Sequence, residues 1–437
     1  MNFWHAFADM SALEASGEFV VDRGEGVHIW DEAGRRYLDA TAGLWYCNVG
    51  WGRTEIADAV ADQLRRLPSY STFGDYSNRP AIELCDRVAA MAPIPGSKVF
   101  LTSGGSDSID TATKMARRYW QLVGEPDRTV LITREQAYHG MHVAGTSLAG
   151  IAANAAGWGD LVGGIAKVPW DDAGALRDAI ASIGAGRVAA FFCEPVVGAG
   201  GVYPPPPGYL AEVRAICRDS GVLFVADEVI TGFGRTGAWF ASTRWGLEPD
   251  LITCAKGLTS GYLPMGAVVA SPRIAEPFWK PGAGLFRHGY TYSGHATAAV
   301  AALANLAIME REDLPGRALD LERRLADALA PFESHPMVAE VRRGAGVLAA
   351  VQFHADAIAA DPSLPARAAS TSRATSNRVR VAINGTAVVD WRDPEPERIK
   401  SGPIGLQLHS NNVPQEIHFK GLKLETFPKE DRLITVK

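Results

Sequence analysis

Long apolar runs, paired cysteines and blocks of a single charge are all missing from this sequence. No stretch approaches the ~20 unbroken apolar residues of a membrane-spanning helix, so no membrane partner is expected. The 5 cysteines are scattered, without a CxxC pair or a Cys/His cluster, which predicts no metal site and favours a reduced, cytoplasmic setting. Lys and Arg total 43 against 49 Asp and Glu, with no basic stripe, so nucleic acid is not an expected partner.

The length of the chain and its first residues also limit which architectures are expected. A chain of 437 residues exceeds the usual size of one domain, so more than one compact unit is expected. The opening MNFWHAFADM has no cationic segment followed by an apolar run, and we expect no secretory signal.

Between about residues 95 and 270, short apolar runs alternate with amphipathic stretches. This alternation is typical of a parallel sheet with crossover helices. The predicted strands are KVFLT, TVLIT, RVAAFF, VLFVA, DLITCA and GAVVA. Apolar residues spaced by three and four from Ile109 to Val123 predict a helix after SGGSD, and two more helices are predicted over 296–312 and 317–332.

Polar residues follow five of these strands. They are Ser103 to Ser106, Tyr138 with His139, Glu194, Asp227 and Lys256. In open α/β sheets, ligands bind beyond the carboxyl ends of the strands. We therefore expect these five positions to converge on one crevice.

Lys256 is the single charged residue between positions 251 and 272. A lysine at the end of a strand is ordinarily a solvated surface residue. Here Gly257 and Gly261 flank it, as close approach of the backbone to a bound ring would require. A desolvated lysine has a lowered pKa, which leaves its amine free to form a Schiff base with a carbonyl.

The other polar positions each have two interpretations. Asp227 is either a cap on the turn after its strand or a partner for a protonated pyridine nitrogen. The Gly/Ser start of the helix after residue 103 is either a simple cap or a phosphate site, and these roles are compatible. Tyr138 either packs in a loop or stacks on a flat cofactor. Taken together, an amine, a carboxylate, a phosphate site and an aromatic ring match the needs of pyridoxal phosphate (PLP).

Seven motifs carry a resemblance to a known family. They are AGLWYCNVGWG, SGGSDSIDTATKMAR, AYHGMHVAG, EPVVGAGGVYPPPPGYL, ADEVITGFGRTGAWF, AKGLTSGYLPMGA and HGYTYSGHATAAVAAL. From residue 1 to about 370, the sequence resembles the class III PLP-dependent aminotransferases, particularly the omega-transaminases such as beta-alanine:pyruvate aminotransferases.

The resemblance implies an α/β fold, the PLP-dependent transferase fold type I. Such a fold has a mostly parallel sheet with helices on both faces and a small α+β domain, here incomplete and followed by a β-rich tail. The implied units are an N-terminal segment over 1–50, a large PLP-binding domain over 51–305, the start of the small domain over 306–370 and the tail over 371–437.

The resemblance also implies a role for each residue that matches a motif. Lys256 would form a Schiff base with PLP and then shuttle a proton, and Asp227 would hold the pyridinium. Trp45 would line the substrate pocket. The remaining expected cofactor-binding residues are Gly105 and Ser106 at the phosphate, Tyr138 and Val229 on the ring faces, His139, Glu194 near the phenolic side, and Thr291 reaching the neighbouring subunit of a homodimer.

The implied activity is ping-pong transamination from an omega-amino acid or amine to a keto acid, with pyruvate expected. Decarboxylases, racemases and aminomutases share the scaffold and remain alternatives. A PLP-binding protein without activity is a further alternative, because the chain offers no residue for the mobile arginine with which relatives grip the keto acid. The family resemblance stops near residue 370.

The tail has a different character from the rest of the chain. The stretch over 360–378 is rich in Pro, Ala, Ser and Arg and predicts a linker, and we expect a protease-sensitive site between residues 360 and 380. Alternation of Val379, Val381 and Ile383 before Asn384-Gly385 predicts a hairpin. The tail resembles the C-terminal strands of a 3-keto-disaccharide hydrolase or laminin-G-like jelly roll, and a glycan-binding role for Trp391 is a minor alternative.

Overall fold

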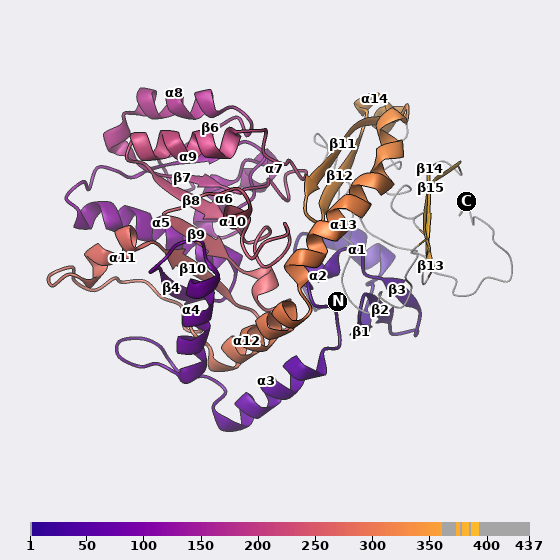
Figure 1. Cartoon of the computed structure of the whole chain (residues 1–437), viewed down its shortest axis with the longest axis horizontal. Coiled ribbons are helices and arrows are strands. Elements are labelled where there is room, and N and C mark those ends of the chain that lie inside the picture. The colour runs from indigo at the N-terminus through magenta and orange to yellow at the C-terminus, as the bar shows by residue number, and fades with distance from the viewer. Residues whose placement is uncertain (1, 361–372, 376–377, 384–385, 393–437) are drawn as a thin grey trace.

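The computed structural model describes residues 2–360 in full, together with the backbone of 373–375, 378–383 and 386–392. The chain is built around one seven-stranded sheet with the order β4-β10-β9-β8-β7-β5-β6. Its strands are β4 (Lys98–Thr102), β5 (Val130–Arg134), β6 (Ile165–Val168), β7 (Val188–Cys193), β8 (Leu223–Asp227), β9 (Leu251–Cys254) and β10 (Gly266–Ala270). In Figure 1 the sheet lies at the centre of the larger part of the molecule.

The sheet is mostly parallel, with β10 running against both of its neighbours. The pairs β5·β6, β5·β7, β7·β8 and β8·β9 are parallel, whereas β10 pairs antiparallel with β4 and with β9. The predicted strands are all present, and the mostly parallel sheet is confirmed. Sequence reasoning missed β6, because IAKV lies at an edge where it is only partly buried and reads as a short apolar run without strand-flanking signals.

Both faces of the sheet are covered, because its central strands β7 and β8 are buried at every position. Leu223 and Val225 of β8 belong to a core shared with α5 and α11, whereas Phe224 and Ala226 belong to a core shared with α4, α8, α9 and α12. Successive side chains of a strand point to opposite faces, so an unbroken apolar run buries both. The helices of the large unit are α3 (Thr54–Arg66), α4 (Arg79–Met91), α5 (Gly105–Leu122), α6 (Val143–Leu148), α7 (Ala152–Ala155), α8 (Ala173–Ile183), α9 (Tyr209–Asp219), α10 (Ala241–Arg244), α11 (Pro272–Trp279) and α12 (Ala296–Arg311).

Smaller elements flank this unit at both ends of the described chain. The N-terminal part contains α1 (Met10–Ser16), a three-stranded antiparallel sheet of β1 (Val21–Glu25), β2 (His28–Asp31) and β3 (Arg36–Leu38), and the short α2 (Ala42–Trp45). After α12 come α13 (Leu314–Leu329), the antiparallel pair β11 (Val338–Ala345) and β12 (Leu348–Phe353), and α14 (Ala355–Ala360). Three 3-10 turns complete the elements, namely η1 (Ala185–Arg187), η2 (Lys256–Leu258) and η3 (Ala330–Ser334).

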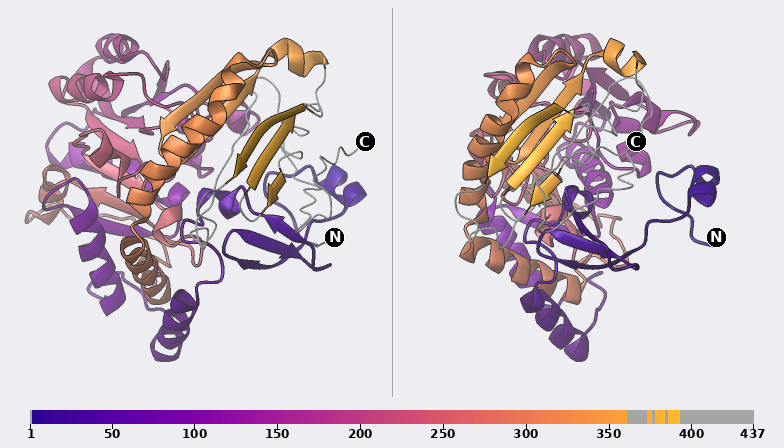
Figure 2. Two further views of the ribbon diagram at one scale, coloured as in Figure 1. Left: turned by 45° about the vertical axis from the view of Figure 1, so that its right-hand side comes forward. Right: turned by 90° about the vertical axis from the view of Figure 1, so that its right-hand side faces the viewer.

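The α1 segment stands apart from the body of the molecule. It buries none of its residues, and the right-hand view of Figure 2 shows it projecting away from the remaining elements. The side chains of Phe3, Trp4 and Phe7, which precede it, are 68%, 83% and 65% exposed. An aromatic arm of this kind is a candidate contact surface.

Part of the tail can be compared with its prediction. Strands β13 (Arg373–Thr375), β14 (Arg378–Ile383) and β15 (Thr386–Arg392) form a sheet in which β14 pairs antiparallel with both neighbours. The hairpin predicted around 384–385 therefore has its two strands. The resemblance to a jelly roll, the proposed linker and Trp391 as a glycan platform concern residues or side chains outside the described part, and they stay predictions. The same holds for the division into four units.

No helix in the described ranges is both long and apolar enough to span a membrane.

Candidate active site

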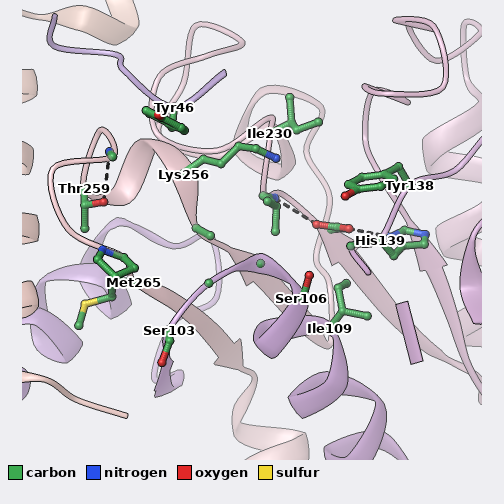
Figure 3. Close-up of a pocket in the computed structure, with 18 of the residues that line it drawn as sticks. Tyr46, Ser103, Ser106, Ile109, Tyr138, His139, Ile230, Lys256, Thr259 and Met265 are labelled. Atoms are coloured by element: carbon green, nitrogen blue, oxygen red, sulfur yellow. Dashed lines mark hydrogen bonds and ion pairs between the residues drawn. The ribbon is translucent and has the colours of Figure 1, made fainter. Parts of the chain in front are cut away.

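A cavity of about 390 Å³ opens at the carboxyl ends of the sheet strands (Figure 3). Its volume lies within the range of small-molecule sites. The predicted convergence of five strand ends is found, since every one of them contributes to the lining. The lining residues from these ends are Ser103, Gly104, Gly105 and Ser106 after β4, Tyr138, His139 and Gly140 after β5, Glu194 after β7, Asp227 at the end of β8, and Lys256 after β9.

Asp227 is a buried carboxylate held by three hydrogen bonds. Its Oδ2 lies 2.6 Å from Nδ1 of His139, and its Oδ1 accepts bonds from the Val229 N–H at 3.1 Å and the Thr253 hydroxyl at 3.0 Å. No lysine or arginine of the described residues forms an ion pair with it. The other ring nitrogen of His139, Nε2, is buried without a partner among these residues. A carboxylate oriented in this way can hold a cationic N–H donor in the cavity.

The amine of Lys256 extends into the cavity toward these groups, as Figure 3 shows. Burial lowers the pKa of Lys256 to about 8, against the raising effects of the Asp227 and Glu194 carboxylates and a further lowering by Arg235. A charged amine loses hydration when buried, and the neutral form is favoured. An amine with a pKa near 8 is partly neutral around neutral pH and can act as a nucleophile.

Glu194 is fixed by backbone groups on either side of the cavity. Its Oε1 accepts the Tyr138 N–H at 3.0 Å and its Oε2 accepts the Gly198 N–H at 2.9 Å. Burial raises its pKa, while His139 opposes that shift. Glu194 thereby couples the loop that carries Tyr138 to the end of β7.

The start of α5 forms a cradle of small residues beside Val229. A Cβ on Gly105 would approach Cγ1 of Val229 to 2.9 Å, and a Cβ on Gly140 would lie 2.3 Å from Oγ of Ser106. Any larger side chain would therefore displace its neighbours. The Ser106 hydroxyl accepts the Met141 N–H at 3.1 Å. Free N–H groups at the start of an 18-residue helix favour an anion such as phosphate.

Asp107, in the first turn of α5, is occupied by other partners. Its Oδ2 accepts the Ser103 N–H at 3.0 Å, and its Oδ1 lies 3.4 Å from Nδ1 of His142. The carboxylate is thus directed at local donors, which reduces its conflict with an anion at the same helix start.

Two predicted site residues do not line the cavity of the single chain. Trp45 packs beside the buried cluster that contains Val196, Val202 and Ile230, and its neighbour Tyr46 lines the cavity instead. Thr291 is exposed, on the loop before α12. Its expected role concerns a neighbouring subunit, so both assignments stay predictions.

Sequence reasoning missed several lining residues that come from loops. These are Tyr46, Ile230, Thr259, Leu263, Pro264 and Met265. A signal existed for some of them, because Tyr46 adjoins Trp45 in one motif and Thr259 to Met265 follow Lys256 in another.

The family model for aminotransferase class-III matches residues 11–390. The chain belongs to the class III aminotransferases. Enzymes of this family depend on PLP, and the predicted family, activity and cofactor are confirmed. The match runs beyond residue 370, where the motifs of the sequence indicate an end.

Relatives of this aminotransferase agree with the assignment. The chain is 41% identical over 372 residues to the putrescine–pyruvate aminotransferase of Pseudomonas aeruginosa, covering 79% of each chain. It is 37% identical to the beta-alanine–pyruvate aminotransferase of the same organism, covering 80% of this chain and 82% of that one. Among solved structures, an (S)-enantioselective omega-transaminase from Thermomicrobium roseum aligns with a TM-score of 0.81 at 38% identity, over 84% of this chain and 87% of that one. The fold-type-I architecture is thereby confirmed.

The residues of the aminotransferase cavity fit PLP. Asp227 has no lysine or arginine partner among the described residues and can accept the pyridinium N–H, and the start of α5 can accept the phosphate. Tyr138 and Val229 supply flat and branched surfaces for the two faces of a ring, and the Lys256 amine is available for a carbonyl.

The buried amine has a cost that can be measured without cofactor. The pKa of Lys256 is about 8 in the folded chain and 10.5 when solvated. Below pH 8 both states are charged and the folded state bears the full penalty; the penalty disappears as the pH rises through 10.5. We expect PLP-free Lys256→Met to be roughly 1–3 kcal/mol more stable than the wild type at neutral pH.

Denaturant titrations at several pH values check this expectation. The advantage of Lys256→Met must shrink as the pH rises from 8 toward 10.5. Lys98→Met serves as the matched control, since Lys98 is exposed at the start of β4, and it should leave stability unchanged at every pH. A gain that is constant with pH would show that the charge of Lys256 is not its source.

Proposed function

We propose that this enzyme transfers the amino group of a primary amine or omega-amino acid to pyruvate through a cavity centred on Lys256. The single observation that carries the proposal is the meeting of the Lys256 amine and the Asp227 carboxylate in one cavity. Pyruvate as acceptor is supported by the similarity to the putrescine–pyruvate and beta-alanine–pyruvate aminotransferases. The five free cysteines of the described residues support a cytoplasmic setting within this proposal.

Each residue has a task in this reaction. When bound, PLP supplies a carbonyl carbon that takes up nitrogen and a ring that withdraws electrons from the reacting carbon. Asp227 would accept the N–H of the ring nitrogen, and His139 and Thr253 hold that carboxylate in place. The Nζ of Lys256 would take a proton from the substrate carbon and deliver it to the cofactor.

The remaining residues position the cofactor. Gly105 and Ser106 would hold its phosphate at the start of α5, where N–H groups are free. Tyr138 and Val229 would contact the ring, and Glu194 accepts the Tyr138 N–H and thereby orients this loop. The proposed role of Trp45 is to shape the substrate side of the cavity through Tyr46. Tyr46 is the next residue in the sequence and lines the cavity.

A specific observation keeps an impaired enzyme as the second candidate. None of the arginines in the described residues lines the cavity, so none of them is placed to pair with the carboxylate of a keto acid. Arg235 lies close enough to lower the pKa of Lys256, but its guanidinium donates to the Trp45 carbonyl at 2.8 Å and to Asn48 Oδ1 at 2.6 Å. If the enzyme is impaired in this way, it takes the amino group from amines but does not transfer it to pyruvate.

The two half-reactions separate these candidates. We expect purified enzyme with PLP to be yellow, putrescine or beta-alanine alone to bleach the band, and pyruvate to restore it with formation of alanine. Lys256→Ala should lose turnover by on the order of 10²–10⁴-fold or more, and Lys98→Ala should retain it. Restoration that fails with pyruvate supports the impaired enzyme, and a band that no amine bleaches contradicts transamination.

A homodimer with shared active sites is also part of the proposal. Large exposed apolar side chains in the N-terminal arm, beside Trp45, between α3 and α4 and beside Thr291 support it. They are Phe3, Trp4, Phe7, Leu44, Tyr70, Phe73, Tyr76 and Tyr292. Thr291, beside Tyr292 and exposed in the single chain, would then reach the phosphate of the neighbouring subunit.

Mixing two inactive variants tests this arrangement. Thr291→Asp places a negative charge toward the neighbouring phosphate, and Lys256→Ala removes the amine. In a mixed dimer one site carries both changes and the other carries neither, so activity should reappear at roughly a quarter of the wild-type level after subunit exchange. Mixtures that stay inactive, although mass measurement detects mixed dimers, would show that each subunit holds a complete site.

A further inference from the structure

The turn that carries Lys256 has a backbone conformation that requires support. Lys256 has a φ of 44°, in the left-handed region that side chains other than glycine seldom adopt. It begins the 3-10 turn η2 directly after β9. Such a conformation persists only where the surrounding structure holds it in place.

The side chain of Asn305, in α12, forms hydrogen bonds directly to this turn. Its Nδ2 donates to the backbone carbonyls of Gly257 and Leu258, both at 2.9 Å. Asn305 is fully buried, and its Oδ1 has no partner among the described residues. The amide therefore acts as a donor alone, directed at the two carbonyls that follow Lys256.

The burial of the Asn305 side-chain amide is energetically unfavourable within α12. Its buried neighbours along the helix are apolar, namely Leu306, Ile308 and Met309. A buried amide in such surroundings is unfavourable unless it makes its hydrogen bonds. No backbone N–H of the described residues outside the regular helices and strands donates to the Gly257 or Leu258 carbonyl, so the loss of Asn305 leaves two acceptors unsatisfied.

Two other segments restrict the same turn. A Cβ on Gly257 would lie 2.5 Å from Nδ2 of Asn48 and 3.0 Å from Cβ of Phe233. The Asn48 amide is itself fixed, because it donates to the Phe233 carbonyl at 3.0 Å. The backbone after Lys256 therefore packs against Asn48 and Phe233 and accepts hydrogen bonds from Asn305.

We propose that Asn305 is a positioning residue for Lys256: its amide holds the turn left-handed so that Nζ stays inside the cavity beside Asp227. This proposal rests on the proposed function, which gives the position of the Lys256 amine its role in catalysis. Its test does not, because the protonation of the Lys256 amine can be measured in the full chain without PLP.

Asn305→Asp is the sharpest variant. It keeps the shape of the side chain and replaces the donor with an oxygen that faces two carbonyl oxygens. Asn305→Ser is the milder second variant, with a shorter hydroxyl donor. Leu306→Ala is the matched control, because Leu306 is equally buried in the same helix, does not line the cavity and has no polar group to bond the turn.

The first readout is the pH midpoint of Lys256 labelling by an amine-selective reagent, followed by peptide mass measurement. The wild-type midpoint should lie near 8. In Asn305→Asp it should move toward the solvated value of 10.5, since a released turn exposes the amine to water. Asn305→Ser should fall between them, and Leu306→Ala should lose stability without a shift in midpoint.

The second readout is turnover of the enzyme with PLP. A misplaced amine should lower kcat on the order of 10²-fold, with KM changed far less. A folded Asn305→Asp or Asn305→Ser with the wild-type midpoint would overturn the proposal, as would a wild-type midpoint already at the solvated value. A wild type that shows the lowered midpoint and the Asn305 shift but no transamination would contradict the proposed function alone.

Discussion

The register between β8 and β9 is the constraint on which the site depends. These parallel strands pair Asp227 with Thr253, and the Thr253 hydroxyl donates to the Asp227 carboxylate at 3.0 Å. Lys256 follows three residues later, at the same end of the sheet. A slip of one residue would turn these side chains to the wrong face, because strand side chains alternate.

The electrostatic character of the cavity follows from this placement. Lys256, Asp227 and Glu194 line one cavity, and both carboxylates are buried, which makes their charged forms unfavourable. The carboxylates favour the charged form of the lysine, and burial and Arg235 favour the neutral form. The balance leaves the amine with a pKa of about 8, far enough below that of a solvated lysine to make it reactive.

Strand-level features were predictable because they depend on local pattern. Unbroken apolar runs predicted β7, β8 and β9, and the rule for strand ends predicted that Glu194, Asp227 and Lys256 meet. The loop-borne lining, such as Tyr46 and Met265, was signalled only by its place in the motifs around Trp45 and Lys256, since loop paths depend on tertiary contacts. Asn305 was also hidden, because an asparagine inside an apolar helix shows its purpose only when its distant carbonyl partners are known. Tyr46 lines the cavity of the single chain and Trp45 does not. Trp45 itself has a positive φ of 62°, which no sequence pattern signals.

The central claim is that the Lys256 amine, among all lysines of the chain, bonds to the carbonyl of PLP. Reduction of the purified enzyme with borohydride makes such a bond permanent, and peptide mass measurement then locates it. The account predicts one added cofactor mass per chain, on the peptide that contains Lys256, and its loss when amine donor is added before reduction. A cofactor mass on a different lysine, or none on an enzyme that transaminates, would contradict it.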